Sequence, residues 1–204
     1  MKNKTNTTSR LLTASAAVLC AFTVRAHAAV IITLQQQGSN VVANGSGTIN
    51  TSALTGIQLA YINSGICASD GPGTYMDMMV GPSTVALVME WNGFTGPSNF
   101  GAGVSLYHAT SGSGDMVGIF DGVLFFPAGY VSGASLSDSA TWANQTFGSL
   151  GVTPGTYTWT WGSGPTADSL TLNATATPEP ASAVLLLGGG ALLGLRRRRP
   201  SAGV

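Results

Sequence analysis

Short apolar runs between turn residues constrain the fold of this chain more than any other feature of its sequence. Gly and Pro punctuate it at Gly81-Pro82, Gly96-Pro97 and Gly162-Ser163-Gly164-Pro165, where they favour turns through unusual dihedral angles and a missing backbone donor. No stretch between the two ends shows an apolar period of 3.6 residues. The pattern predicts an all-β fold, an antiparallel β-sandwich or jelly-roll-like core. The expected strands are residues 30–36, 41–43 with 48–50, 57–62, 84–91, 104–109, 116–126, 141–147, 156–161 and 169–173.

Charge is distributed very unevenly along the chain. All eight Lys and Arg residues lie at the two ends, and none occurs between residues 29 and 177. That stretch carries seven acids and a net charge of −7, although the whole chain is neutral. Because phosphate contacts need Lys or Arg, we expect no nucleic-acid partner. A catalytic lysine and an arginine clamp are excluded for the same reason.

The clearest strand pair comes last in this stretch. Tyr157, Trp159 and Trp161 alternate with threonines, so period two places the three aromatic rings on one face. The alternating segment 168–172 follows a glycine-rich turn, which predicts a hairpin. Because Leu170 and Leu172 share a face of the partner strand, we expect the aromatic rings to be buried. The alternative is an exposed aromatic platform on which Tyr157, Trp159 and Trp161 stack sugar rings.

The stretch from 29 to 177 offers few groups for catalysis. Its only histidine is His108, which is expected on the half-exposed face of a strand. A serine hydrolase needs a histidine base beside its nucleophile, and a zinc site usually needs three protein ligands. A glycosidase needs only two acids. The acids considered are Glu90, beside Trp91; Asp115 and Asp121, which would share a side of one regular strand; and Asp70 and Asp138, which have turn-like surroundings.

We assign no catalytic, cofactor-binding or metal-binding residue, and we expect no enzyme activity. Calcium stays open as a cofactor because a net charge of −7 attracts cations, but no calcium-binding loop identifies ligands. Cys20 lies in a segment expected to be removed, which leaves Cys67 as a small buried apolar residue or as one half of an intermolecular disulfide.

Residues 1–28 have the organisation of a secretory signal peptide. Lys2, Lys4 and Arg10 precede an apolar stretch over residues 11–24, which is too short to span a bilayer readily. Signal peptidase is expected to recognise Ala26 and Ala28 and to leave Ala29 as the new N-terminus. The alternative is a retained N-terminal membrane helix.

The C-terminal segment, residues 178–204, combines three features in a fixed order. Pro178-Glu179-Pro180 is followed by an uncharged membrane segment from Ala181 to Leu195, which contains three consecutive glycines, and then by the basic cluster Arg196, Arg197, Arg198 and Arg199. The positive-inside rule places the arginines in the cytoplasm and the domain outside. An ordinary C-terminal membrane anchor is the alternative.

Together these features resemble the PEP-CTERM sorting signal of Gram-negative bacteria. In that family, a membrane-embedded protease called exosortase is held to recognise the signal and to process the protein for export. The resemblance implies exosortase as a partner, transient residence in the inner membrane, and final delivery to the cell surface or extracellular matrix. Sequence segments such as Thr153-Pro154-Gly155-Thr156-Tyr157 also resemble those of the low-charge β domains that proteins of this family often carry.

We therefore expect three parts: a signal peptide (1–28), a Gly/Ser/Thr-rich β-sandwich domain (29–177) and a sorting signal (178–204). The expected function is that of a non-catalytic surface or matrix protein associated with exopolysaccharide and biofilm. The alternative is a secreted carbohydrate-binding or carbohydrate-active β-sandwich protein.

Overall fold

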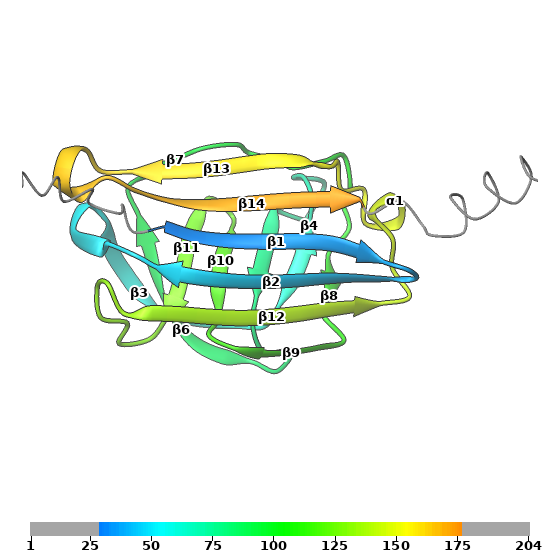
Figure 1. Cartoon of the computed structure of the whole chain (residues 1–204), viewed down its shortest axis with the longest axis horizontal. Helices are drawn as coiled ribbons and strands as arrows, with labels where there is room; N and C mark the ends of the chain where they lie inside the picture. Colours follow the sequence, from blue (N-terminus) through cyan, green and yellow to red (C-terminus); the bar gives the residue numbers. More distant parts are fainter. Residues whose placement is uncertain (1–28, 177–204) are drawn as a thin grey trace, which may run out of the picture.

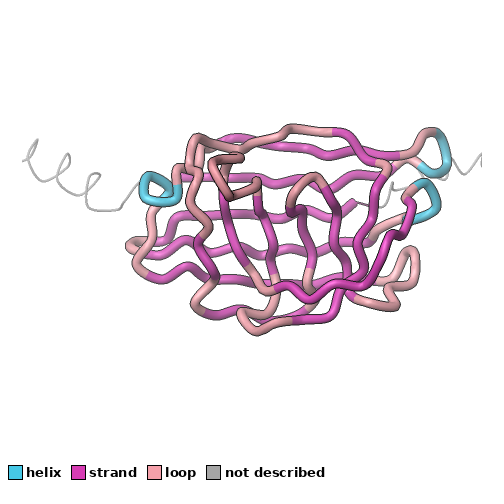
Figure 2. Tube along the Cα trace, turned by 180° about the vertical axis from the view of Figure 1, so that it is seen from behind, coloured by secondary structure: helices cyan, strands magenta, loops and turns pink. Residues whose placement is uncertain are grey.

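The computed structural model describes residues 29–176, which form a sandwich of two seven-stranded sheets. Figure 1 shows the first sheet in front, with the strands of the second sheet crossing behind it. Figure 2 shows the second sheet from behind, together with the loops that join its strands. The all-β sandwich expected from the sequence is confirmed. The predicted signal peptide and sorting signal lie outside the described residues.

The first sheet has the strand order β7-β13-β14-β1-β2-β12-β9. Its strands are β7 (Phe94–Thr95), β13 (Gly155–Trp161), β14 (Asp168–Ala176), β1 (Ala29–Gln37), β2 (Asn40–Thr48), β12 (Ser135–Ala143) and β9 (Ser111–Gly114). All neighbours are antiparallel except β1 and β14, which pair in parallel from Ala29↔Ser169 to Gln36↔Ala176. This parallel pair differs from the wholly antiparallel expectation.

The second sheet has the order β3-β6-β11-β10-β5-β4-β8, and all its pairs are antiparallel. Its strands are β3 (Thr55–Ile62), β6 (Ala86–Asn92), β11 (Val123–Pro127), β10 (Val117–Phe120), β5 (Asp77–Val80), β4 (Gly65–Cys67) and β8 (Tyr107–His108). The described helices are single turns: α1 (Phe147–Leu150), η1 (Thr51–Ala53) and η2 (Gly164–Thr166). Within residues 29–176, none is long and apolar enough to cross a bilayer.

The main core lies between the two sheets and follows from the period-two alternation of their strands. On β12, Leu136, Ala140 and Trp142 point inward and are buried together with Asp138, whereas the alternate residues on the outward face are more exposed. On β5, Met78 and Val80 join the same core. The residue between them, Met79, packs instead into a second cluster with Val88, Met116 and Phe125. The second sheet is therefore apolar on both faces over its central strands.

Local turn chemistry explains where the strand boundaries differ from the sequence prediction. The expected strand 116–126 is a hairpin, because Asp121 and Gly122 adopt φ values of 49° and 71° and form a two-residue turn between β10 and β11. The expected strand 141–147 ends at Ala143. Thr146 then caps α1 by accepting a hydrogen bond from the Ser149 amide.

Other segments were assigned wrongly because they are short or rich in glycine. Residues 111–114 were not among the expected strands but form β9, which pairs with β12. Strands β4 and β5 were not predicted, although β5 is buried along its whole length. Most of the expected strand 104–109 is irregular, and only β8 pairs there.

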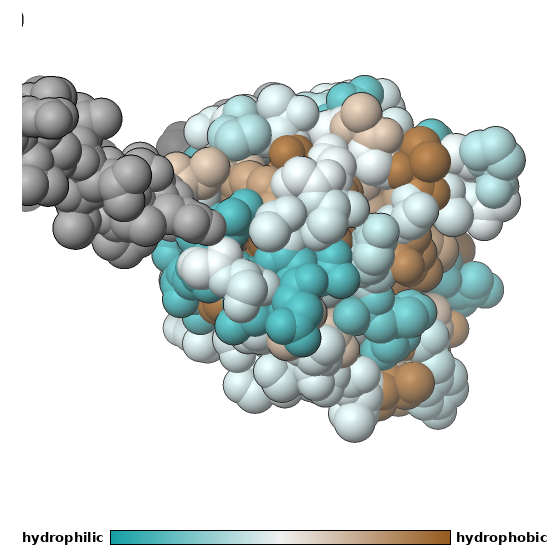
Figure 3. Space-filling view, turned by 90° about the vertical axis from the view of Figure 1, so that its right-hand side faces the viewer, coloured by the Kyte–Doolittle hydropathy of each residue, from teal (hydrophilic) through white to brown (hydrophobic). Residues whose placement is uncertain are grey.

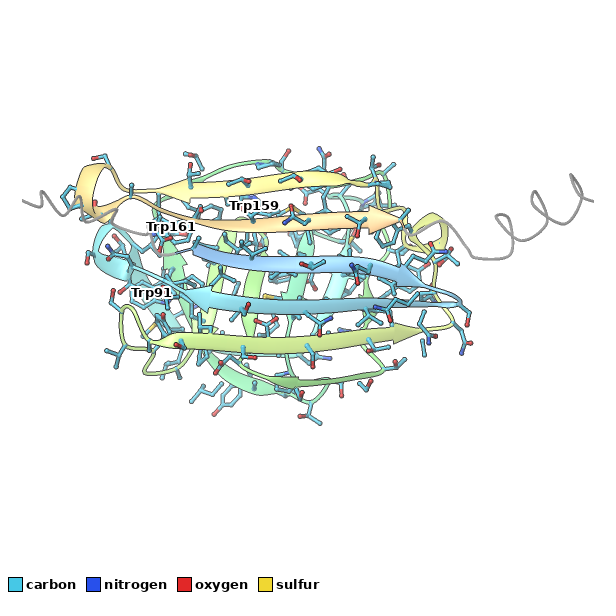
Figure 4. All side chains as sticks on the ribbon, viewed as in Figure 1. Trp91, Trp159 and Trp161 are labelled. Atoms are coloured by element: carbon cyan, nitrogen blue, oxygen red, sulfur yellow. The ribbon has the colours of Figure 1, made fainter. Side chains whose placement is uncertain are left out.

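The predicted β13–β14 hairpin is confirmed, and its aromatic residues are core residues. Trp159 and Trp161 are 1% and 4% exposed, and Tyr157 is partly buried against the same core. Figure 4 shows both indoles beside β13 and β14. Leu170 and Leu172 are fully buried, whereas Thr156, Thr158 and Thr160 are exposed. The exposed stacking platform is therefore not formed on β13, because its aromatic face is the face that packs on the second sheet.

Replacing Trp159 with alanine should test this burial. We expect Trp159→Ala to lower the free energy of unfolding by about 3–5 kcal/mol, because it removes a large buried ring and leaves a cavity. Thr160→Ala, on the exposed face of the same strand, should cost less than about 1 kcal/mol. Urea unfolding of the 29–176 segment measures both changes. Equal, small effects would show that the indole is not part of the core.

Candidate functional site

A cavity of about 450 Å³ opens between the β7 edge of the first sheet and the β10–β11 turn of the second. This volume falls within the range of about 300–1,000 Å³ that is typical of small-molecule sites. The walls combine carboxylates, hydroxyls and apolar groups from four separate segments of the chain. The lining residues are Asp70, Met76, Phe94, Thr95, Gly96, Pro97, Ser98, Ile119, Asp121, Gly122 and Trp159.

Backbone hydrogen bonds position the two acids of the cavity. The Met76 amide donates to Asp70 Oδ1 at 2.6 Å, and the Asp121 amide donates to the Met76 carbonyl at 3.2 Å. Met76 therefore connects the loop before β5 to the β10–β11 turn. Both acids are exposed, so their carboxylates can meet a ligand without being desolvated beforehand.

Trp159 holds the opposite wall in place. Its Nε1 donates to the Pro97 carbonyl at 2.8 Å, which fixes the segment after β7 against the buried indole. Gly96 lies so close to the ring that a Cβ atom there would stand 2.3 Å from Trp159 Cδ1. Only glycine permits this approach. The half-buried Phe94 and Pro97 supply the apolar surface beside it.

The other acids considered from the sequence do not form a pair. Asp115 and Asp121 lie beyond opposite ends of β10, and only Asp121 lines the cavity. The regular strand on which they would share a side is not formed, because Asp121 lies in the β10–β11 turn. Asp115 Oδ2 accepts a hydrogen bond from the Ser137 amide, and Glu90 accepts one from Gln58 Nε2. These contacts give both carboxylates structural partners.

Asp138 differs from its expected turn-like surroundings. It lies within β12 on the face that packs inward, is 5% exposed, and has no hydrogen-bond partner for either carboxyl oxygen. The carboxyl group lies against Gly45, where a Cβ atom would stand 2.3 Å from Oδ1. Asp70 does lie in a loop, as expected.

His108 and Cys67 have the surroundings that the sequence predicted. His108 is an exposed residue of β8, and its Nδ1 lies 3.1 Å from Asn63 Nδ2. Cys67 is a free, fully buried thiol on β4, and burial raises its pKa. A buried thiol with a raised pKa is a poor nucleophile and a poor partner for an intermolecular disulfide.

Two buried carboxyl groups have strongly raised pKa values, and neither was singled out from the sequence for this property. Burial raises the pKa of Asp77 to about 8, and the Met79 amide offsets part of this effect. Burial and the neighbouring Asp115 carboxylate raise the pKa of Asp138 to about 7. The Gly45 amide, close to Asp138 but outside hydrogen-bonding geometry, lowers it slightly. Burial is the main cause of both shifts, and within 29–176 no Lys or Arg is present to offset it, so both pKa values stay far above the ordinary 3.8.

Among residues 29–176, no three His, Cys, Asp or Glu side chains lie together in a way that would hold a metal ion. Comparisons of the chain with protein-family models, with curated proteins and with solved structures found no match.

The buried acids should make the domain less stable as pH rises. In the unfolded chain their carboxyl groups titrate near 3.8, whereas in the folded domain they keep their protons up to about pH 8 and about 7. Unfolding therefore releases protons between these values, and alkaline conditions favour it. We expect the urea midpoint of the 29–176 segment to be lower at about pH 8 than at about pH 5.

Asp138→Asn should flatten this pH dependence, because the variant has no proton to release at that site. Glu90→Gln also removes one carboxyl group, from a half-exposed side chain, and serves as the control. A midpoint that rises with pH in the unmodified chain would contradict the account. So would an Asp138→Asn variant that keeps the full pH dependence.

Proposed function

We propose that this chain is a non-catalytic protein exported to the cell surface or extracellular matrix of a Gram-negative bacterium. The observation that carries this proposal is the order of its segments. A charged and then apolar leader extends to Ala28. Pro178-Glu179-Pro180, an apolar segment and Arg196–Arg199 follow the domain in that order, and no Lys or Arg lies between 29 and 177. Signal peptidase and an exosortase-type protease are the proposed processing enzymes, and the inner membrane is a transient location.

The position of the domain ends supports display on a surface. Because β1 and β14 run in parallel, the described chain begins at one end of the sandwich and finishes at the other (Figure 1). A domain held by its C-terminal side would present the opposite end, with η1 and η2, away from the membrane. Figure 3 shows the end near the C-terminal side, where hydrophilic and hydrophobic residues are interspersed.

The placement of the polar groups supports a non-catalytic role. The Asp70 and Asp115 carboxylates accept hydrogen bonds from backbone amides, Glu90 bonds Gln58, and His108 lies against Asn63. Each of these contacts stabilises a loop or a strand pair. A glycosidase needs two carboxyl groups flanking one scissile bond, and among these four groups only Asp70 lines the cavity.

Changing Glu179 should test the sorting role. Glu179 is the only acid in the C-terminal 30 residues. Because proline disfavours helix, we expect a protease to meet this sequence as an extended substrate. We expect Glu179→Ala to insert into the membrane but to stay unprocessed. Replacing Arg196–Arg199 with neutral residues should impair orientation and retention before processing.

The measurement is the mass and yield of the chain in the surface fraction of the native host. Glu90→Ala is the matched control, because Glu90 and Glu179 are the only glutamates in the chain. If Glu179→Ala and a deletion of residues 178–204 both reach the surface with unchanged yield and mass, the sorting role is wrong.

A further inference from the structure

We propose that the cavity beside Trp159 binds a neutral sugar unit of an extracellular polysaccharide. This inference rests on the proposed export of the chain, which would bring the domain into contact with such polymers. It assigns a ligand class to a site formed by the segment after β7, the loop before β5 and the β10–β11 turn.

The net negative charge of the domain disfavours anionic ligands. With seven acids and no Lys or Arg between residues 29 and 177, the domain has no strong counter-charge for a phosphate, sulfate or carboxylate group. The one described histidine, His108, does not line the cavity. Asp70 and Asp121 at the cavity would repel an anionic ligand. The ligand is therefore neutral or cationic.

The mixed chemistry of the walls favours a sugar among neutral ligands. Phe94 and Pro97 offer apolar surface, on which the C–H face of a pyranose ring can be buried. Asp70 and Asp121 offer carboxylate oxygens that accept hydrogen bonds from hydroxyl groups, and bonds to charged acceptors are the stronger kind. A purely apolar ligand would displace water from these carboxylates and offer no hydrogen-bond donor in its place.

The cavity is also held in shape before any ligand arrives. Trp159 Nε1 donates a hydrogen bond to the Pro97 carbonyl oxygen at 2.8 Å. The Met76 amide donates to Asp70, and the Met76 carbonyl accepts from the Asp121 amide. Asp121 stands in a two-residue hairpin turn, whose geometry is set by the pairing of Phe120 with Val123. A site built in this way loses little conformational entropy on binding.

The experiment uses the exported chain purified from its host and an array of neutral and acidic oligosaccharides. Calorimetry then measures the affinity for the neutral oligosaccharide that binds best. Asp121→Asn keeps the turn, because asparagine tolerates a positive φ, but removes the charged acceptor. We expect this variant to weaken binding about tenfold or more, which corresponds to the loss of a charge-assisted hydrogen bond. Phe94→Leu should also weaken binding by reducing the apolar surface.

Glu90→Gln is the matched control, because it removes the same charge outside the cavity and should leave the affinity unchanged. The proposal is overturned if no neutral oligosaccharide binds, or if Asp121→Asn and Asp70→Asn both bind as tightly as the unmodified chain. It is also overturned if spermidine binds and the neutral oligosaccharides do not, since the cavity would then be a cation site. Surface yield and terminal mass of the Asp121→Asn chain report separately on export, so failure of sugar binding and failure of the export proposal are distinguishable.

Discussion

Apolar packing between the two sheets is the interaction on which the rest of this structure depends. Because no Lys or Arg lies between residues 29 and 177, no carboxylate of the described domain can form an ion pair with a Lys or Arg of the same domain. Four of the acids show the two main alternatives to an ion pair. Asp70 and Asp168 accept hydrogen bonds from backbone amides, whereas Asp77 and Asp138 are buried and favour their neutral forms. Folding therefore relies on side chains that alternate across strands, and its pH dependence comes from carboxyl groups that must stay protonated.

The same lack of positive charge connects the fold to the proposed role. Without a positive charge, the cavity beside Trp159 has no counter-charge for an anionic ligand and is better suited to a neutral, hydroxyl-rich one. Trp159 belongs to both the core and the cavity. Its ring is buried in the core, and its Nε1 donates a hydrogen bond to Pro97 in the segment that forms one cavity wall. Trp159 is buried as the sequence predicted, and it lines the cavity from inside the core rather than as part of an exposed stacking surface.

The sequence predicted those parts of the fold in which local pattern and tertiary packing agree. The β13–β14 hairpin followed from alternating aromatic residues and threonines, and the burial of Leu170 and Leu172 followed with it. The β10–β11 turn was missed although the Asp121-Gly122 dipeptide is a strong signal for it. Strands β5 and β9 were missed because a four-residue segment carries too little periodicity, and β9 consists of Ser and Gly alone. The cavity itself was not predictable, since it joins segments that come together only through the crossing of the two sheets.

The central claim is that the chain is trimmed at both ends and that the β-sandwich is the part delivered outside. Mass-spectrometric mapping of both termini on surface material from the native host tests this claim most directly. The account predicts that the mature protein begins at Ala29 and has lost Arg196–Arg199. Surface protein that still carries Met1, or that retains the intact arginine cluster, would contradict it.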